Sequence, residues 1–271
     1  MKALSYKEVV MARQKVDKQT RKAILEARSM IEAIAEADMN EAETRKRIDR
    51  LFEILMGYDT FKHITQEYAI HGVGDTVHCD FAVQVNRKES SKPDFLVEIK
   101  RVNVDLAPKH LRQAASYAID IGCDWVLLTN GKEWKLYHIS FTKPPQTKLI
   151  DSWNIMSDGT AVLADKFNLI SCRSIRKNSL ARLWEKANVL SAQNTLRVIL
   201  SEKSLILMRR ELRQLTDAMV SPEEIVGAIR HLLNETALAE MEKIKISLPE
   251  KKPRKRKAIS KDGRDQEEPQ A

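Results

Sequence analysis

The sequence predicts an α/β fold in which a mixed β-sheet is flanked by helices. Three observations support this class: amphipathic helical segments before Gly57, short apolar runs of β character between residues 61 and 139, and a helical segment at 106–121 between those runs. A series of β-strands that is preceded and interrupted by helices along the sequence is typical of α/β domains. The 271 residues suffice for one such domain and a smaller second region.

Two helices are predicted before Gly57. Tyr6 to Ala37 should form one long helix, because apolar residues recur there at helical spacing and neither Pro nor Gly interrupts them. Asn40 has the side chain of a helix N-cap and should open the second helix. Gly57 should end it, since glycine readily takes the left-handed conformation that follows many helices.

Five segments after Gly57 have the apolar character of β-strands: Phe61–Ile70, Val77–Val85, Phe95–Lys100, Asp124–Thr129 and Glu133–Ile139. The polar loop 86–93 should make the second and third strands an antiparallel hairpin. The helix Leu106–Ile121 should connect the third strand to the fourth, and an Asn130-Gly131 turn should join the last two.

The pattern becomes helical again beyond Phe167. Four helices are expected there: Leu180–Leu190, Gln193–Leu200, Ser204–Met219 and Pro222–Ala239. The chain is therefore divided into an N-terminal helix (1–38), an α/β domain (39–150), a helical C-terminal region (151–248) and a basic disordered tail (249–271). The Leu- and Ile-rich faces of the helical region predict that it packs on the domain or forms an interface with a partner or a second copy.

Charge and composition narrow the class of protein. The formal net charge is +8, and half of it comes from residues 251–271, so the rest of the chain permits nucleic acid as a partner without requiring it. No apolar run is long enough to cross a bilayer, and the first residues show no signal-peptide pattern. Three scattered cysteines without ligand spacing predict a cytoplasmic protein that has no disulfide and no structural zinc. The lack of a long apolar run predicts no membrane partner.

The chemically informative residues are Asp80, Glu98 and Lys100. Alternate side chains of a strand share a face, so Glu98 and Lys100 point the same way at the end of an apolar strand. If the predicted hairpin forms, Asp80 can lie beside Glu98, and two carboxylates with a strand carbonyl suit Mg²⁺. A neighbouring lysine can then position a water for attack on phosphorus. The plainer alternative is a same-face ion pair between Glu98 and Lys100 on an exposed strand.

Eight short motifs follow one another along the chain: Glu43-Thr44-Arg45, Leu55-Met56-Gly57-Tyr58-Asp59, Glu67, His78-Cys79-Asp80-Phe81-Ala82-Val83, Val97-Glu98-Ile99-Lys100, Gln113-Ala114-Ala115-Ser116-Tyr117, Leu128-Thr129-Asn130-Gly131 and Trp134-Lys135-Leu136-Tyr137. In this order they resemble the nuclease domain at the start of the restriction subunit of type I restriction enzymes, a branch of the PD-(D/E)XK nucleases. The resemblance covers about 100 residues, and it implies a restriction-endonuclease-like fold. Pro93-Asp94 spells the namesake pair but is treated as a decoy, because Asp94 lies on the same strand as Glu98.

The resemblance implies roles for the residues around the predicted metal site. Asp80, Glu98 and the carbonyl of Ile99 would bind Mg²⁺, or Mn²⁺ in its place. Lys100 would handle the attacking water. These four positions form the centre of the implied active site.

Four further residues are implied with an ordinary structural alternative beside each. Glu43 would approach the site from its helix, although Asn40 and Glu43 also form a capping box. Gln113 and Tyr117 lie four apart on one helix face and would line the site near the substrate phosphate, but such a pair is also common on helix surfaces. Glu67 would support the site from the first strand or would simply be exposed.

The function implied by the resemblance is Mg²⁺-dependent endonucleolytic hydrolysis of DNA in restriction or antiviral (antiphage) defence, with DNA and other defence-system subunits as partners. The alternative is a catalytically silent DNA-binding or assembly subunit with the same fold. RNA as substrate is also compatible with the motif chemistry. The sequence contains no GxxxxGK[ST] loop, so no nucleotide-driven motor is expected, whereas the type I restriction subunit joins its nuclease domain to a translocase.

Overall fold

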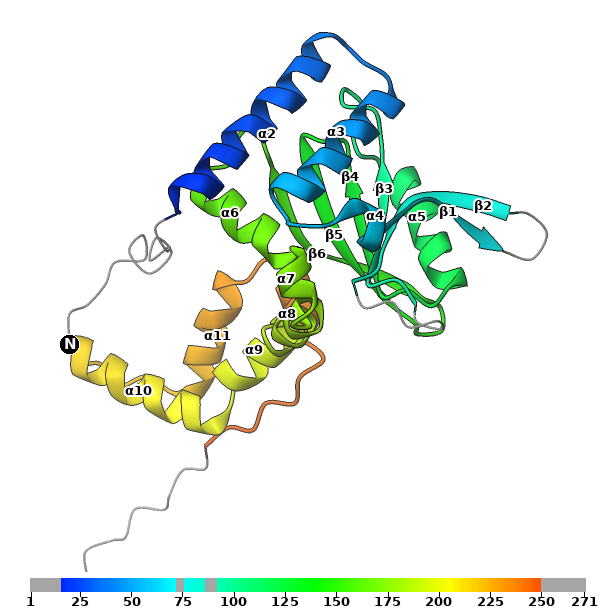
Figure 1. Ribbon diagram of the computed structural model, residues 1–271. Helices are drawn as coiled ribbons and strands as arrows, with labels where there is room; N and C mark the ends of the chain where they lie inside the picture. The colour runs from blue at the N-terminus through cyan, green and yellow to red at the C-terminus, as the bar shows by residue number, and fades with distance from the viewer. Residues whose placement is uncertain (1–15, 72–75, 86–91, 250–271) are drawn as a thin grey trace, which may run out of the picture. The chain divides into compact units, whose positions relative to one another are not determined.

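The computed structural model describes residues 16–71, 76–85 and 92–249, which divide between residues 187 and 188 into two compact units. Along the first unit lie α2 Lys18–Glu36, α3 Glu41–Ile54, α4 Thr60–His63, β1 Ile64–His71, β2 Thr76–Val83, β3 Phe95–Ile99, α5 Pro108–Asp120, β4 Trp125–Thr129, β5 Glu133–Ser140, β6 Gln146–Asn154, α6 Thr160–Leu169 and α7 Cys172–Ile175 (Figure 1). Helix α8, Ser179–Val189, spans the division between the units.

The six strands form one mixed sheet in the order β1-β2-β3-β4-β5-β6. Strands β3 and β4 are parallel and are connected through α5, whereas every other neighbouring pair is antiparallel. The α/β class, the mixed sheet and the β2–β3 hairpin predicted from the sequence are therefore confirmed. All five residues of β3 and of β4 are buried, as expected for central strands.

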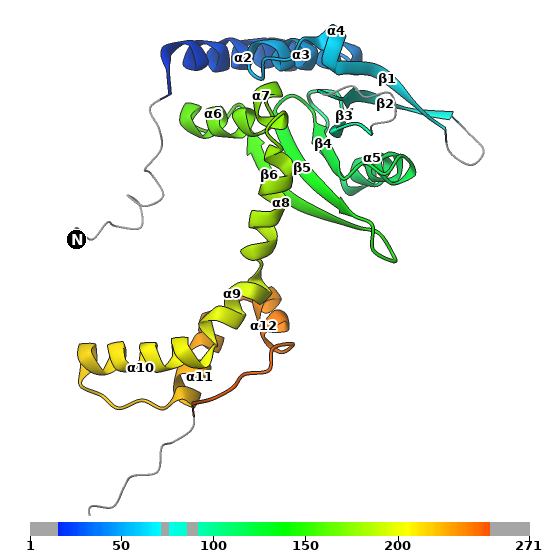
Figure 2. The same cartoon turned by 60° about the horizontal axis from the view of Figure 1, so that its bottom comes forward.

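Helices cover both faces of the sheet. On one face α2, α3 and α6 pack together, and α5 lies on the other face (Figure 2). Alternate residues of β3 reach the two layers: Val97 and Ile99 join the core under α2 and α3, whereas Leu96 joins the core under α5. By the alternation of a strand, Glu98 follows Leu96 toward the α5 face.

Helices α2 and α3 follow the sequence signals. Ile24, Ile31 and Ile34 form the buried stripe of α2, while residues 6–15 of the predicted long helix lie outside the described residues. Asn40 caps α3 by accepting a hydrogen bond from the backbone N–H of Glu43 at 3.0 Å. Gly57, with φ +68°, follows the end of this helix as expected.

The segment after Gly57 differs from the prediction at its start. The predicted strand Phe61–Ile70 begins only at Ile64, because Asp59 caps the short helix α4 by accepting a hydrogen bond from the N–H of Lys62. Phe61 is consequently 93% exposed. An aspartate that precedes a helical turn competes with the β propensity of the residues after it.

Strand β6 and helix α6 were not predicted. The boundary expected after residue 150 therefore differs from the division between residues 187 and 188 that the structure shows. Residue 150 lies inside β6, and α6 continues the first unit. Phe167 of α6 sits edge-on against Trp134 and Trp153, with ring centroids 5.2 and 5.7 Å away. Most of β6 is exposed, so it shows little of the apolar alternation from which a strand is predicted. Its pairing with β5 creates it.

The second unit contains α9 Ala192–Ile199, α10 Glu202–Thr216, α11 Pro222–Leu232 and α12 Glu235–Met241. Leu196, Leu200 and Met241 form its buried centre. The predicted helix Pro222–Ala239 is divided in two, because the Asn234 side chain caps α12. No helix among the described residues has the length and apolar character needed for a bilayer crossing. All three cysteines of the chain are buried with free thiols.

Candidate active site

Strand β3 ends in a buried ion pair. Glu98 is only 2% exposed, and its Oε1 accepts a hydrogen bond from Lys100 Nζ at 2.6 Å. The backbone N–H of Lys100 still donates to the carbonyl of Thr129 on β4, so the strand pairing holds the lysine in place. The contact expected from strand alternation is present, and it is buried rather than exposed.

Asp80 approaches the same end of β3 from the neighbouring strand. The register pairs Phe81 with Val97, so the next residues along the two strands are Asp80 and Glu98. Asp80 Oδ2 accepts a hydrogen bond from the backbone N–H of Ile99 at 2.7 Å. In a strand the N–H and C=O of one residue face the same neighbour, so the carbonyl of Ile99 also faces the side of Asp80. The carboxylate of Asp80 thus accepts the hydrogen bond of a backbone N–H at the place where the β2–β3 pairing ends.

The second oxygen of Asp80 has a partner to which the sequence assigned no role. Arg45 on α3 places its Nη2 2.5 Å from Asp80 Oδ1, and its Nη1 lies 3.2 Å from Glu67 Oε1. Both oxygens of Asp80 are therefore engaged within the protein, one by a backbone amide and one by a guanidinium. The Arg45 position belongs to the Glu43-Thr44-Arg45 motif, but nothing in its spacing indicates contact with Asp80.

Burial dominates the electrostatics of Glu98. It raises the pKa of this carboxyl to about 7, against the lowering effect of the Lys100 hydrogen bond and charge, while the charges of Asp80 and Glu41 add to the rise. For Lys100, burial lowers the pKa but the hydrogen bond and charge of Glu98 outweigh it, so the pKa of the ammonium is raised. The lysine consequently keeps its proton in the neutral range, and the glutamate is poised to lose its own there.

This arrangement predicts a pH dependence of stability in the absence of divalent cations. Folded Glu98 keeps its proton up to about pH 7, whereas an unfolded glutamate loses it near 4.5. The Glu98 contribution to the free energy of unfolding should therefore be complete below pH 4.5 and be lost as the pH rises through 7. Urea unfolding from pH 5 to 8 measures this. Glu98→Gln should flatten the decline relative to wild type, and an identical slope in both proteins would refute the assignment.

Two of the other predicted residues contact each other. Gln113 Nε2 donates to the Tyr117 hydroxyl at 2.8 Å on α5, and Tyr117 is buried. The described contacts join neither residue to Asp80, Glu98 or Lys100. The position of this pair next to the substrate thus stays a prediction.

Glu43 and Glu67 are held elsewhere. Glu43 Oε1 pairs with Lys46 at 2.6 Å and Glu43 Oε2 with Arg47 at 3.4 Å, both on its own helix, and the Lys46 hydrogen bond lowers the pKa of Glu43. The side chain of Glu67 is 71% exposed and is connected to Asp80 through Arg45, which contacts both carboxylates. The structure thus connects Glu43 to neighbouring basic side chains rather than to Asp80 or Glu98.

Sequence reasoning missed two residues that interact electrostatically with Glu98 or Lys100. Glu41, in the first turn of α3, raises the pKa of both Glu98 and Lys100. His110, near the start of α5, is buried, and its pKa is lowered by that burial and by the charge of Lys100. The sequence offered no signal beyond the proximity of Glu41 to the Glu43 motif.

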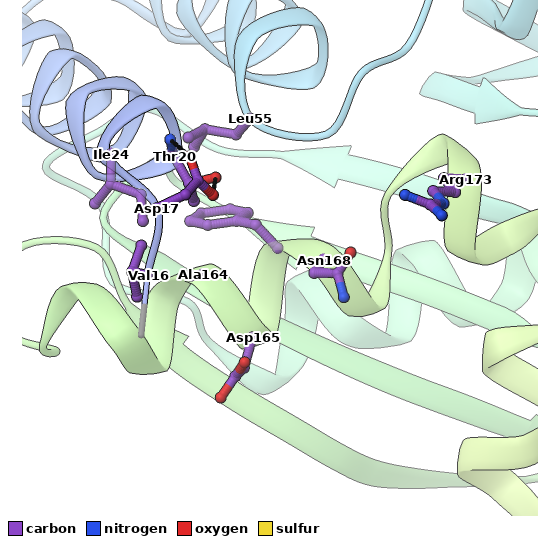
Figure 3. A pocket seen from close by; sticks show the side chains of 10 residues that line it. Val16, Asp17, Thr20, Ile24, Leu55, Ala164, Asp165, Asn168 and Arg173 are labelled. Carbon is purple, nitrogen blue, oxygen red and sulfur yellow. Dashed lines mark hydrogen bonds between the residues drawn. The ribbon is translucent and has the colours of Figure 1, made fainter. Parts of the chain in front are cut away.

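The cavity beside Asp80 does not extend to Glu98 and Lys100. A cavity of about 240 Å³ lies beside Asp80 and is lined by Arg45, Glu67, His78, Cys79 and Asp80, without Glu98 or Lys100. A separate cavity of about 420 Å³ lies between α2, α6 and α7. There Asp17 is bonded to Thr20, and Asp165 and Arg173 lie apart on its wall (Figure 3). Its polar groups do not converge, so Asp80 and β3 remain the candidate site.

The donor atoms at the end of β3 fit a magnesium ion better than a transition metal. They are the carboxylates of Asp80 and Glu98 and the carbonyl of Ile99, all hard oxygens. The described part of the chain contains no group of three or more His, Cys, Asp or Glu side chains that could hold a metal ion. Mg²⁺ usually keeps several waters and takes only one or two protein carboxylates, so a site of this composition is consistent with that ion.

Comparison with known proteins agrees with the motif order. Residues 40–152 match the family described as type I restriction enzyme R protein N terminus, which confirms the resemblance over that segment. A chain of a solved DrdV–DNA complex is 12% identical in sequence, with a TM-score of 0.40, over 55% of this chain and 96% of the other. Among curated proteins no match is found.

Proposed function

We propose that residues 40–152 form a Mg²⁺-dependent nuclease domain that hydrolyses DNA phosphodiester bonds in restriction or antiphage defence. The observation that carries the proposal is the end of β3, where buried Glu98 is bonded to Lys100 and the intervening Ile99 is bonded to Asp80. Burying two carboxylates and a lysine close together costs stability, so their presence at this place supports a chemical role beyond the contacts that hold them. The family match over the same segment supports this proposal.

Each residue then has a distinct part. Asp80, Glu98 and the Ile99 carbonyl would hold Mg²⁺, which when bound stabilises negative charge on the phosphate. Since the pKa of Lys100 is raised, its Nζ carries a proton and orients a water or stabilises an anionic oxygen by donating hydrogen bonds. Acceptance of a proton from the water by Lys100 is disfavoured by the same shift.

One observation favours the catalytically silent alternative. Arg45 already neutralises Asp80, so the fold can satisfy this carboxylate without any metal. In that case the domain would bind DNA or assemble with other subunits and leave the DNA intact.

The experiment that separates the two functions uses the full chain with supercoiled plasmid, single-stranded DNA and RNA. Each substrate is incubated with Mg²⁺, with Mn²⁺ and with EDTA. The proposal predicts DNA cleavage in Mg²⁺ or Mn²⁺ and none in EDTA. Binding of DNA without cleavage under every metal condition would support the silent subunit, and cleavage of RNA alone would change the substrate class.

A further inference from the structure

Arg45 bridges two carboxylates of very different exposure. Its guanidinium lies 2.5 Å from Asp80 and 3.2 Å from Glu67, and the side chains of these residues are 9% and 71% exposed. Arg45 Nε is buried and has no hydrogen-bond partner within the described structure. The two Nη atoms of Arg45 thus contact carboxylates whereas Nε does not, although the five N–H donors of a guanidinium allow more contacts.

The backbone around Glu67 is shaped to present this second carboxylate. Strand β1 pairs with β2 on both sides of it, Gln66 with Phe81 and Tyr68 with Cys79, but Glu67 and Asp80 are not paired. Glu67 has φ +46°, a left-handed conformation that is unfavourable for a residue with a side chain. A local irregularity of this kind redirects a side chain, and here the Glu67 side chain meets Arg45.

A guanidinium and a divalent cation cannot share Asp80 without strong repulsion. Arg45 occupies Oδ1, which is the oxygen of Asp80 left over after the Ile99 N–H has engaged Oδ2. Two like charges within a few ångströms repel strongly even at the effective dielectric of a protein surface. A cation that binds Asp80 must therefore displace Arg45, and the exposed Glu67 together with the 240 Å³ cavity provides a second position for the guanidinium.

We propose that Arg45 is a positioning residue that balances the charge of Asp80 in the metal-free protein and competes with the divalent cation for it. The inference rests on the proposed metal site at Asp80 and adds to it a residue, Arg45, that opposes the binding of the cation. It accounts for the engagement of both oxygens of Asp80 by partners within the protein, and it makes cation affinity depend on a side chain that is not a ligand. Release of Arg45 to Glu67 is the structural change that accompanies cation binding.

The test measures Mn²⁺ binding alone, without nucleic acid, by titration followed with the electron paramagnetic resonance of the free ion. Arg45→Gln should bind Mn²⁺ about tenfold more tightly than wild type, because it removes the competing charge. Arg45→Lys keeps that charge and should stay close to wild type. Arg50→Gln is the matched control: it removes one charge from the same helix, where Arg50 pairs with Glu53 at 2.6 Å, and it should not change the affinity.

Melting curves in metal-free buffer accompany the titration. Arg45→Gln should melt lower than wild type, since Asp80 loses its partner, and added Mn²⁺ should raise its melting temperature more than that of wild type. Equal or weaker Mn²⁺ affinity in Arg45→Gln, or equal tightening by Arg45→Lys, would overturn the competition while leaving the metal site itself in place. Absence of Mn²⁺ binding in all four proteins would instead remove the proposed function and this inference with it.

Discussion

Replacing Asp80 by asparagine is expected to lower the rate of DNA cleavage by about 10²–10³-fold, the usual cost of losing one group that stabilises developing charge. The amide keeps the shape of the carboxylate and its oxygen can still accept the Ile99 N–H, which now lies at 2.7 Å from Asp80 Oδ2. The fold should survive, but without a gain in stability, because the ion pair with Arg45 is lost. Cleavage rate, DNA affinity and melting temperature of the variant measure the three effects.

The matched control is Asp94→Asn, the same chemical change at the aspartate that follows Pro93. Asp94 Oδ2 accepts a hydrogen bond from the N–H of Val85 at 2.8 Å, a structural contact that an asparagine oxygen can keep. This variant should cleave at the wild-type rate. If Asp94→Asn loses activity and Asp80→Asn keeps it, the namesake Pro93-Asp94 pair is the true motif and the assignment of Asp80 is wrong.

The largest effect on stability is expected from Phe167→Ala. This side chain is 2% exposed and sits edge-on against both of the stacked indoles of Trp134 and Trp153, so its removal leaves a cavity where α6 covers the sheet. Losses of about 3–5 kcal/mol in the free energy of unfolding are typical for a buried phenylalanine. The four tryptophans of the chain all lie in the first unit, so urea unfolding followed by tryptophan fluorescence reports on this unit.

Phe61→Ala provides the comparison at constant chemistry. Phe61 is 93% exposed at the start of α4, and the substitution should change the free energy of unfolding by less than about 0.5 kcal/mol. A loss at Phe167 no larger than that at Phe61 would mean that α6 is not part of the core of the first unit.

The parts of the fold that could be predicted are those in which local pattern and tertiary environment agree. Strand β3 is largely apolar because it is central, and Glu98 near its end shares a face with Lys100 just beyond it by simple alternation. Asn40 and Gly57 mark the limits of α3 through their own backbone preferences. Those signals are contained within a few residues, so the sequence alone suffices.

The parts that could not be predicted depend on contacts distant in sequence. Strand β6 exists because β5 offers it a partner, not because Gln146–Asn154 alternates in polarity. Arg45 meets Asp80 because α3 crosses the sheet there and the left-handed Glu67 leaves a gap in the pairing of β1 and β2. Glu43 was expected to point into the site, but it pairs with Lys46 and Arg47 on its own helix. The direction of its side chain depends on how α3 packs on the sheet, which the local sequence does not specify.

The most direct test of the nuclease assignment is to measure Mn²⁺ binding and plasmid cleavage together in Lys100→Ala. Lys100 donates to Glu98 but provides no oxygen ligand, so the variant should still bind Mn²⁺ and DNA, while its cleavage rate falls by about 10²–10³-fold. Asp80→Asn, measured in parallel, should lose both Mn²⁺ affinity and cleavage. Cleavage by Lys100→Ala at the wild-type rate, in a protein that binds Mn²⁺ normally, would contradict the assignment of the end of β3 as the active site.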